Sequence, residues 1–167
     1  DVRSRTISDP DGRVKDRISK LRPEEVGRQT VSNLKQNGVD LYFETQNTVL
    51  RAVLAQPLLP GQSTELTLDF SGQVPVQIRR SGRNNKEGVD YSMAQWYPKL
   101  AAYDRHGWHP DPYVGREFYG DFGRFDVNIG LPAIYVVGAT GVEVPAIVNE
   151  PIPYKGRKAK REVRWWR

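Results

Sequence analysis

The chain has 167 residues, with 25 Lys and Arg against 20 Asp and Glu, two His and no Cys. Its length suits a single domain, and 38% hydrophobic residues argue against an intrinsically disordered tail. The lack of cysteine excludes disulfides, a thiolate nucleophile and a cysteine-ligated zinc site. No apolar run reaches the roughly 18–20 residues of a membrane helix, so we expect no membrane span.

The net charge of +5 is concentrated at one end of the chain. Residues 155–167 contain seven basic residues and one acid, a net +6, which leaves −1 for residues 1–154. The sequence therefore predicts a nearly neutral body with a basic end. The chain also starts without Met or a signal-peptide core, which is typical of a processed or excised piece.

The first 38 residues are rich in both signs of charge and poor in aromatics. Pro23, followed by two glutamates, predicts the start of a short helix that runs towards Lys35 and stops at Asn37-Gly38. This is the one helix that the sequence indicates, and it lies near residues 23–36.

After residue 38 the hydrophobic period changes to two, which is typical of strands. Residues 39–44 and 48–54 flank a short polar link and predict a hairpin. Residues 64–70 alternate cleanly, with Leu66, Leu68 and Phe70 on one face. Further strands are predicted at 74–79, 89–96, 124–131 and 134–139.

Short strands without alternating helices predict an all-β fold, either an antiparallel β-sandwich or a pair of curved sheets. We expect one domain over residues 1–167. It divides into a charged segment (1–38), a β body (39–154) and a basic junction (155–167), whose alternating end at 163–167 predicts a final strand.

Two histidines leave few routes to catalysis. His106 and His109 form an H-x-x-H pattern in a loop rich in Gly and Pro, without the Glu and helical spacing of a metallopeptidase signature. We interpret them as polar loop residues. Five acids crowd residues 104–126, but no two are singled out as a glycosidase pair. The sequence predicts no catalytic residue and no metal ligand in this chain.

Aromatic residues are dense between positions 96 and 125. Such a cluster can be core, a surface that meets another domain, or a platform for sugar or base faces. We favour core and domain interface. The members are Trp96, Tyr97, Tyr103, Trp108, Tyr113, Phe118, Tyr119, Phe122 and Phe125.

The central block, residues 72–104, reads G-Q-V-P-V-Q-I-R-R-S-G-R-N-N-K-E-G-V-D-Y-S-M-A-Q-W-Y-P-K-L-A-A-Y-D. It resembles the N-terminal domain of bacterial zinc metallopeptidases of the aminopeptidase N family, closest to the branch common in Bacteroidetes. Residues 16–29, 107–129 and 135–141 carry the same likeness. The resemblance implies a saddle-shaped β domain packed against a gluzincin-type catalytic domain of the same polypeptide, and a periplasmic or secreted location.

In that family the zinc and the general base belong to an H-E-x-x-H motif of the catalytic domain. This chain has no such motif, so the resemblance implies no zinc here and no activity of the chain alone. Family members line the pocket for the substrate's amino terminus with a T-Q-x-E pattern. Here Gln95 keeps the Gln and Tyr97 occupies the acid position, which implies that both bind peptide substrate. Alternatively, Gln95 only satisfies a loop backbone.

Two other functions remain open from the sequence. The first is a stand-alone carbohydrate- or ligand-binding β-sandwich that uses Trp96, Tyr97, Trp108 and Tyr113 as stacking faces. The second is nucleic-acid binding by the basic end, which we disfavour because the body has no basic stripe to continue it. We therefore expect no nucleic-acid partner.

Overall fold

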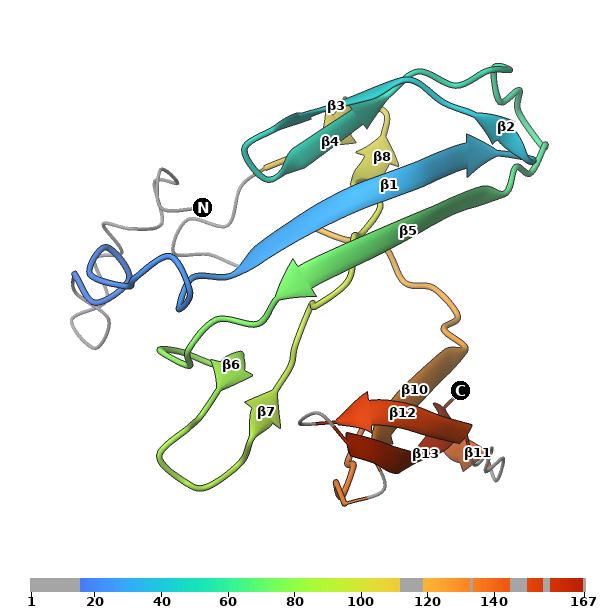
Figure 1. Cartoon of the computed structure of the whole chain (residues 1–167). Coiled ribbons are helices and arrows are strands. Elements are labelled where there is room, and N and C mark those ends of the chain that lie inside the picture. The colour runs from blue at the N-terminus through green and yellow to red at the C-terminus, as the bar shows by residue number, and fades with distance from the viewer. Residues whose placement is uncertain (1–15, 112–118, 133, 145–149, 155–156, 167) are drawn as a thin grey trace. The chain divides into compact units, whose positions relative to one another are not determined.

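A computed structural model describes residues 16–111, 119–132, 134–144, 150–154 and 157–166; side chains are described as far as Glu143. The chain forms two compact units, Asp1–Gly120 and Asp121–Arg167. Figure 1 traces the chain in colour from its N-terminus to its C-terminus.

The main sheet of the first unit has the strand order β2–β1–β5, and both pairings are antiparallel. Its strands are β1 (Arg28–Gln36), β2 (Val39–Asp40) and β5 (Leu66–Gln73). The two-residue turn between β1 and β2 is Asn37-Gly38, with φ of 47° and 85°. Asn-Gly suits this turn because both residues tolerate positive φ, and the turn's twist matches that of the strands.

The predicted helix near residues 23–36 is absent, and β1 occupies most of that range. The start signal is real: the backbone N–H of Arg22 donates to the Glu25 carboxylate at 2.9 Å, and Val26 N–H donates to Arg22 C=O at 3.2 Å. Only one turn forms, because the following residues are β-branched or polar and pair with β5 instead. The predicted stop at Asn37-Gly38 is the hairpin turn.

Three small hairpins complete the first unit. β3 (Phe43–Gln46) and β4 (Val49–Ala52) confirm the hairpin predicted between residues 39 and 54, although β3 is shorter than expected. The predicted strand at 89–96 is reduced to β7 (Tyr91–Ser92), which pairs with β6 (Gly82–Arg83). Of the predicted strand at 74–79, Val76 alone forms a bridge, parallel to Arg83. The third hairpin joins β8 (Ala102–Asp104) and β9 (Gly107–His109).

The second unit is a four-stranded antiparallel sheet in which β13 (Arg157–Trp166) pairs with each of the three other strands. β10 (Val127–Pro132) confirms the strand predicted at 124–131, and β13 confirms the final strand over its described residues. The strand predicted at 134–139 is not formed in the described residues of that range. The remaining strands are β11 (Glu143–Val144) and β12 (Glu150–Tyr154).

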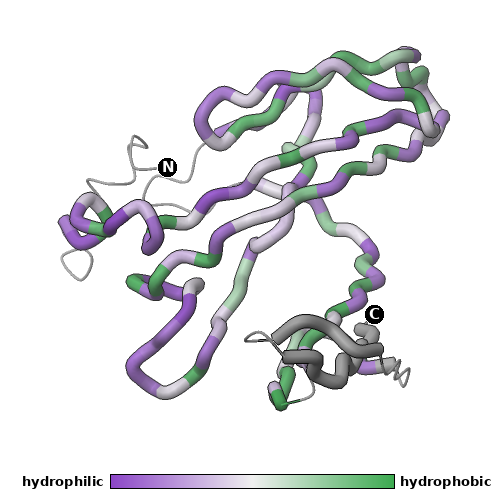
Figure 2. Tube along the Cα trace, in the orientation of Figure 1, coloured by the Kyte–Doolittle hydropathy of each residue, from purple (hydrophilic) through white to green (hydrophobic). Residues whose placement is uncertain are grey.

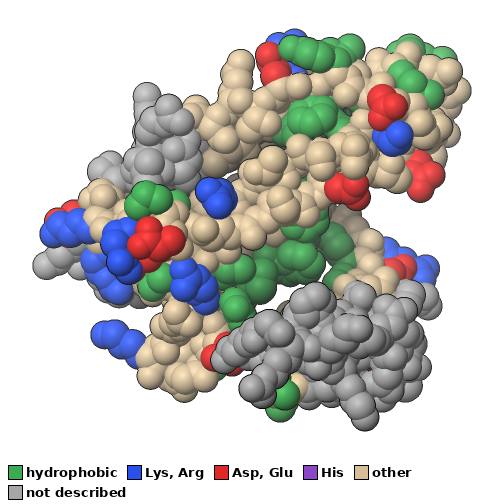
Figure 3. Space-filling view, in the orientation of Figure 1, with side chains coloured by type: hydrophobic (Ala, Val, Ile, Leu, Met, Phe, Trp, Pro, Cys, Tyr) green, Lys and Arg blue, Asp and Glu red, His purple; other side chains and the backbone are tan. Residues whose placement is uncertain are grey.

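The fold is all-β with antiparallel sheets, as predicted, and the described residues contain no helix, hence none that would cross a membrane. Hydrophobic and hydrophilic residues are interleaved along the strands of the first unit (Figure 2). Among the described residues of this unit, the buried apolar side chains are Leu34, Leu41 and Ala102. Many large apolar side chains reach the surface instead, and some are visible on the face in Figure 3. Within the described residues, the core is small.

Candidate functional site

The segment around Gln95 is fixed on both sides by side chains from distant positions. Ser81 Oγ donates to Ala94 C=O at 3.1 Å and accepts from Ala94 N–H at 2.9 Å. On the other side, the Gln29 amide of β1 donates to Trp96 C=O. The backbone that carries Gln95 is therefore held from both directions.

Between these two attachments Gln95 adopts a left-handed backbone conformation, with φ of 55°. This region costs a residue with a Cβ roughly 1–2 kcal/mol, so the surrounding contacts must hold it in place. The Gln95 side chain is exposed, and its amide bonds to none of the described residues. In the described residues, no hydrogen bond between the Gln95 side chain and a loop backbone group is present, which is what the alternative interpretation requires.

Trp96 and Tyr97 form an aromatic wall beside Gln95. The two rings meet edge to face, with centroids 5.7 Å apart, and the Trp96 ring also lies 6.1 Å from that of Phe70 on β5. Tyr97 is half-buried. Val31 is the cross-strand partner of Phe70, and Gln29 lies two residues before it, so both belong to the sheet face that Trp96 covers.

The rest of the aromatic cluster lies elsewhere. Tyr103 and Trp108 are cross-strand partners on the β8–β9 hairpin, with centroids 4.9 Å apart and exposed fractions of 63% and 58%. Tyr119 packs edge to face on His109. Tyr113 and Phe118 lie outside the described residues.

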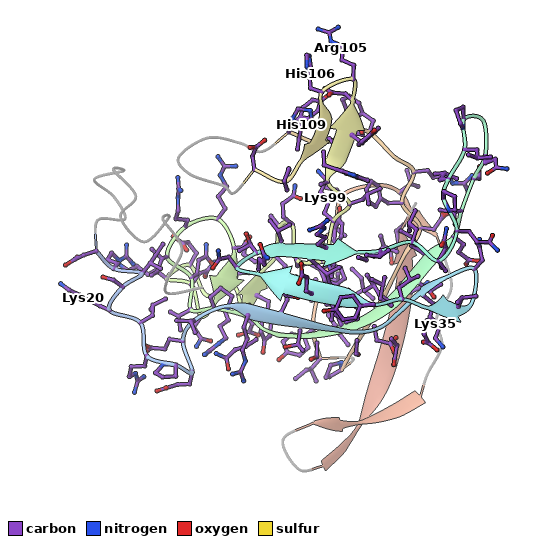
Figure 4. The ribbon with its side chains drawn as sticks, turned by 90° about the horizontal axis from the view of Figure 1, so that it is seen from above. Lys20, Lys35, Lys99, Arg105, His106 and His109 are labelled. Carbon is purple, nitrogen blue, oxygen red and sulfur yellow. The ribbon has the colours of Figure 1, made fainter. Side chains whose placement is uncertain are left out.

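The two histidines have separate local partners on the β8–β9 hairpin. His106 lies at the turn, where its Nε2 accepts from Arg105 Nε at 2.9 Å, and both side chains point away from the hairpin (Figure 4). His109 Nε2 lies 3.0 Å from Asp104 Oδ1. No group of three potential metal-ligating side chains occurs in the described residues. His106 is an exposed turn residue, as interpreted from the sequence, whereas His109 lies on β9 and is half-buried.

Asp104 is the centre of this small polar network. Its Oδ1 also accepts from the backbone N–H of His106 at 2.8 Å. The hydrogen bond with His109, followed by the one from the His106 backbone, holds the pKa of Asp104 below its ordinary value. The carboxylate therefore stays charged to a lower pH than an isolated Asp, which locks the hairpin rather than preparing an acid catalyst.

A shallow hollow of about 300 Å³ lies on the other face of the β1–β5 pair. Arg28 pairs with Gln73 and Thr30 pairs with Ser71 across the strands, so their side chains share the face opposite Phe70 and Trp96. The hollow is thus separate from the surface around Gln95. Its lining residues are Arg28, Thr30, Ser71, Gly72 and Gln73.

No protein-family model, curated protein or solved structure matches this chain. The candidate site therefore depends on the geometry above and on the sequence resemblance. Sequence reasoning named Gln95 and Tyr97 but missed Ser81, Gln29 and Phe70, which fix and back them. Gln29 is 67 positions from Trp96, and no local pattern signals a contact at that separation.

Proposed function

We propose that this chain is the non-catalytic N-terminal domain of an aminopeptidase N-like zinc metallopeptidase. In this role it walls the active-site cleft and binds the amino terminus of the peptide substrate through Gln95 and Tyr97. The observation that carries the proposal is the exposed Gln95 amide, which is held in a left-handed backbone conformation between two fixed neighbours. The resemblance of residues 72–104 to that family supports it.

The chemistry of the two side chains suits an ammonium group. The Gln95 Oε1 accepts hydrogen bonds, and a substrate amino terminus carries donors with a positive charge. The Tyr97 ring, which packs against Trp96, provides an aromatic wall that limits the width of the pocket. A hydrogen bond to a charged group contributes about 1.5–3 kcal/mol. With Tyr97 in place of a carboxylate, recognition relies on this neutral acceptor.

The backbone that carries the Gln95 amide is held on both sides. A polar group positioned before the substrate arrives avoids the entropic cost of ordering it on binding. Strained backbone conformations occur preferentially at functional sites, where surrounding contacts maintain them. Gln95 meets this description, because Ser81 and Gln29 hold both neighbouring residues.

The zinc and the general base would come from the catalytic domain of the same polypeptide. In this proposal the chain's own contribution is to bind and orient substrate. We expect the purified 167-residue chain to show no metal-dependent peptide hydrolysis. Turnover that is abolished by a chelator would contradict this assignment.

The test of Gln95 uses the polypeptide that joins this chain to its catalytic domain. We expect Gln95→Ala to raise KM for peptides with a free amino terminus about 10- to 100-fold, from the loss of a hydrogen bond to a charged group. N-acetylated peptides should be unaffected. Gln46→Ala is the matched control, because Gln46 is an exposed glutamine on β3. Equal effects of Gln95→Ala on both peptide classes would refute the proposed role.

One observation favours a second candidate, a stand-alone carbohydrate-binding module. Tyr103 and Trp108 present a pair of exposed, adjacent rings on a hairpin, and such rings can stack on sugar faces. Titration with soluble oligosaccharides, followed by tryptophan fluorescence, distinguishes the two functions. A saturable change that Trp108→Ala removes would favour the carbohydrate-binding module.

A further inference from the structure

β5 forms one border of the main sheet. One side of the strand pairs with β1 from Leu66 to Gln73. Along the other side, no backbone group of β5 bonds to any part of the chain that the structure describes. Because backbone groups of a strand point alternately to its two sides, an eight-residue strand presents a row of outward donors and acceptors. Such a row is a template for another strand.

The strand lacks the features that usually protect a sheet edge. Protected edges are short, contain Pro or Lys, or carry a β-bulge. β5 reads L-T-L-D-F-S-G-Q, with neither Pro nor Lys, and the irregularity in the β1–β5 ladder lies on β1 between Ser32 and Lys35. Its single charge, Asp69, accepts a hydrogen bond from Asn33 of β1. By contrast, β2 at the opposite border has only two residues.

One face of β5 is apolar and partly uncovered. Leu66, Leu68 and Phe70 alternate along the strand and therefore share this face. Leu66 is 43% exposed and Phe70 is 37% exposed. A strand added beside β5 would satisfy the open backbone groups and also cover these two side chains.

We propose that a second copy of this chain occupies the open edge, with the two β5 strands antiparallel and Leu68 opposite the partner's Leu68. The two three-stranded sheets then form one continuous six-stranded sheet. In this register Leu66 faces the partner's Phe70, and Thr67 faces the partner's Asp69. Apolar residues thus meet apolar residues, and no two like charges are directly opposite.

Neighbouring symmetric registers are worse for identifiable reasons. Each symmetric register is named by the residue that lies opposite its own copy. A register centred on Thr67 sets Glu65 opposite the partner's Asp69, and one centred on Asp69 sets the two Asp69 carboxylates opposite each other. Directly opposed like charges destabilise a strand pair. A register centred on Phe70 keeps one apolar pair, Phe70 with the partner's Phe70, but it sets Leu68 opposite the partner's Gly72 and leaves Leu66 beyond the end of the partner's strand. The register centred on Leu68 forms three apolar pairs. The sequence of β5 therefore selects one self-complementary register.

The first test measures the mass of the chain by light scattering across a concentration series. We expect twice 19.0 kDa at high concentration. Leu66→Lys places a charge against the partner's Phe70 and should restore the monomer. Leu59→Lys is the matched control, because Leu59 is also exposed but lies in the loop between β4 and β5. A chain that stays monomeric throughout, whether or not its edge accepts other peptides, overturns the proposal.

The second test identifies the register by disulfide cross-linking. Because the chain has no cysteine, only the introduced cysteines can form a disulfide. Thr67→Cys and Asp69→Cys are prepared as separate chains, each at an exposed position. Paired residues across antiparallel strands have Cα atoms about 4.5–5.5 Å apart, within disulfide range. We expect a rapid disulfide only when the two variants are mixed. A dimer that forms without this cross-link uses another surface, which would refute the β5 pairing. Both outcomes are independent of the role proposed for Gln95.

Discussion

Gln36 and Gln95 are the same residue type in two opposite situations. Gln36 is 3% exposed; its amide donates to Gln56 C=O and Thr64 Oγ1 and accepts from Gln56 N–H. Gln95 is exposed, and its amide bonds to no described residue, while Ser81 and Gln29 hold its neighbours. In the first case the side chain builds a loop. In the second the loop presents the side chain, which is the arrangement that a binding residue needs.

The largest expected effect comes from removing the buried glutamine. Gln36→Ala deletes three hydrogen bonds that fix the loop after β4, so we expect a loss of about 2–3 kcal/mol in the free energy of unfolding. Urea denaturation measures this loss, and Gln46→Ala on exposed β3 is the control with almost no effect. An unchanged unfolding midpoint for Gln36→Ala would mean that this glutamine does not build the loop.

A smaller loss is expected where the loop holds Gln95. Ser81→Ala removes both hydrogen bonds to Ala94, and we expect it to lower the free energy of unfolding by about 1–2 kcal/mol. Because Ser81 Oγ accepts from Ala94 N–H, the Ala94 backbone amide should exchange hydrogen faster in the variant than in the unaltered chain. Hydrogen-exchange mass spectrometry or NMR measures this difference. Unchanged protection at residues 94–96 would show that Ser81 is not the attachment.

Gln95→Gly should act in the opposite direction. Glycine adopts positive φ without the steric cost of a Cβ, although it loses more entropy on folding, so we expect a net gain of about 0.5–1 kcal/mol. The same change removes the amide and should weaken peptide binding in the complete enzyme. A variant that is more stable but binds peptide more weakly would show that the Gln95 side chain serves binding rather than the stability of the fold. A loss of stability would show that the Gln95 side chain contributes to the fold.

The smallest effect concerns pH. Hydrogen bonds from Arg22 hold the pKa of Glu25 at about 2, below its ordinary value of 4.5. The stabilisation from this pair is therefore present above pH 4.5 and is lost as the pH falls towards 2. Arg22→Gln should flatten the fall in melting temperature within this window. The pair is on the surface, so the effect should also weaken with added salt.

The sequence predicted those elements whose signals are local. The alternation that ends at Phe70 and the hairpin before residue 54 depend on neighbouring residues, and both were located. The break at Asn37-Gly38 was also located, but it was interpreted as a helix stop and is a hairpin turn. β1 was predicted as a helix because Pro23 and the two glutamates after it are a helix-start signal, and in the structure this signal forms a single turn. Its true conformation depends on pairing with β5, whose partner residues lie 30 to 45 positions further along the chain.

For the candidate site, the sequence named the exposed residues but not their support. Gln95 and Tyr97 came from a motif resemblance, which says nothing about which backbone atoms are held. The positive φ of Gln95 and its attachments through Ser81 and Gln29 are consequences of tertiary packing. A glutamine in a left-handed conformation has no sequence signal of its own, unlike Asn or Gly.

The position of β13 in the second unit has a consequence for biosynthesis. All three other strands of that sheet pair with residues 157–166 and form no ladder with one another in the described part of the chain. The β1–β5 ladder can close once the ribosome has released residue 73, but the partners of β10 lie 29 to 39 residues downstream. Of the four strands in the second unit, β13 is made last. The sheet can therefore assemble only after the β1–β5 ladder of the first unit is able to form.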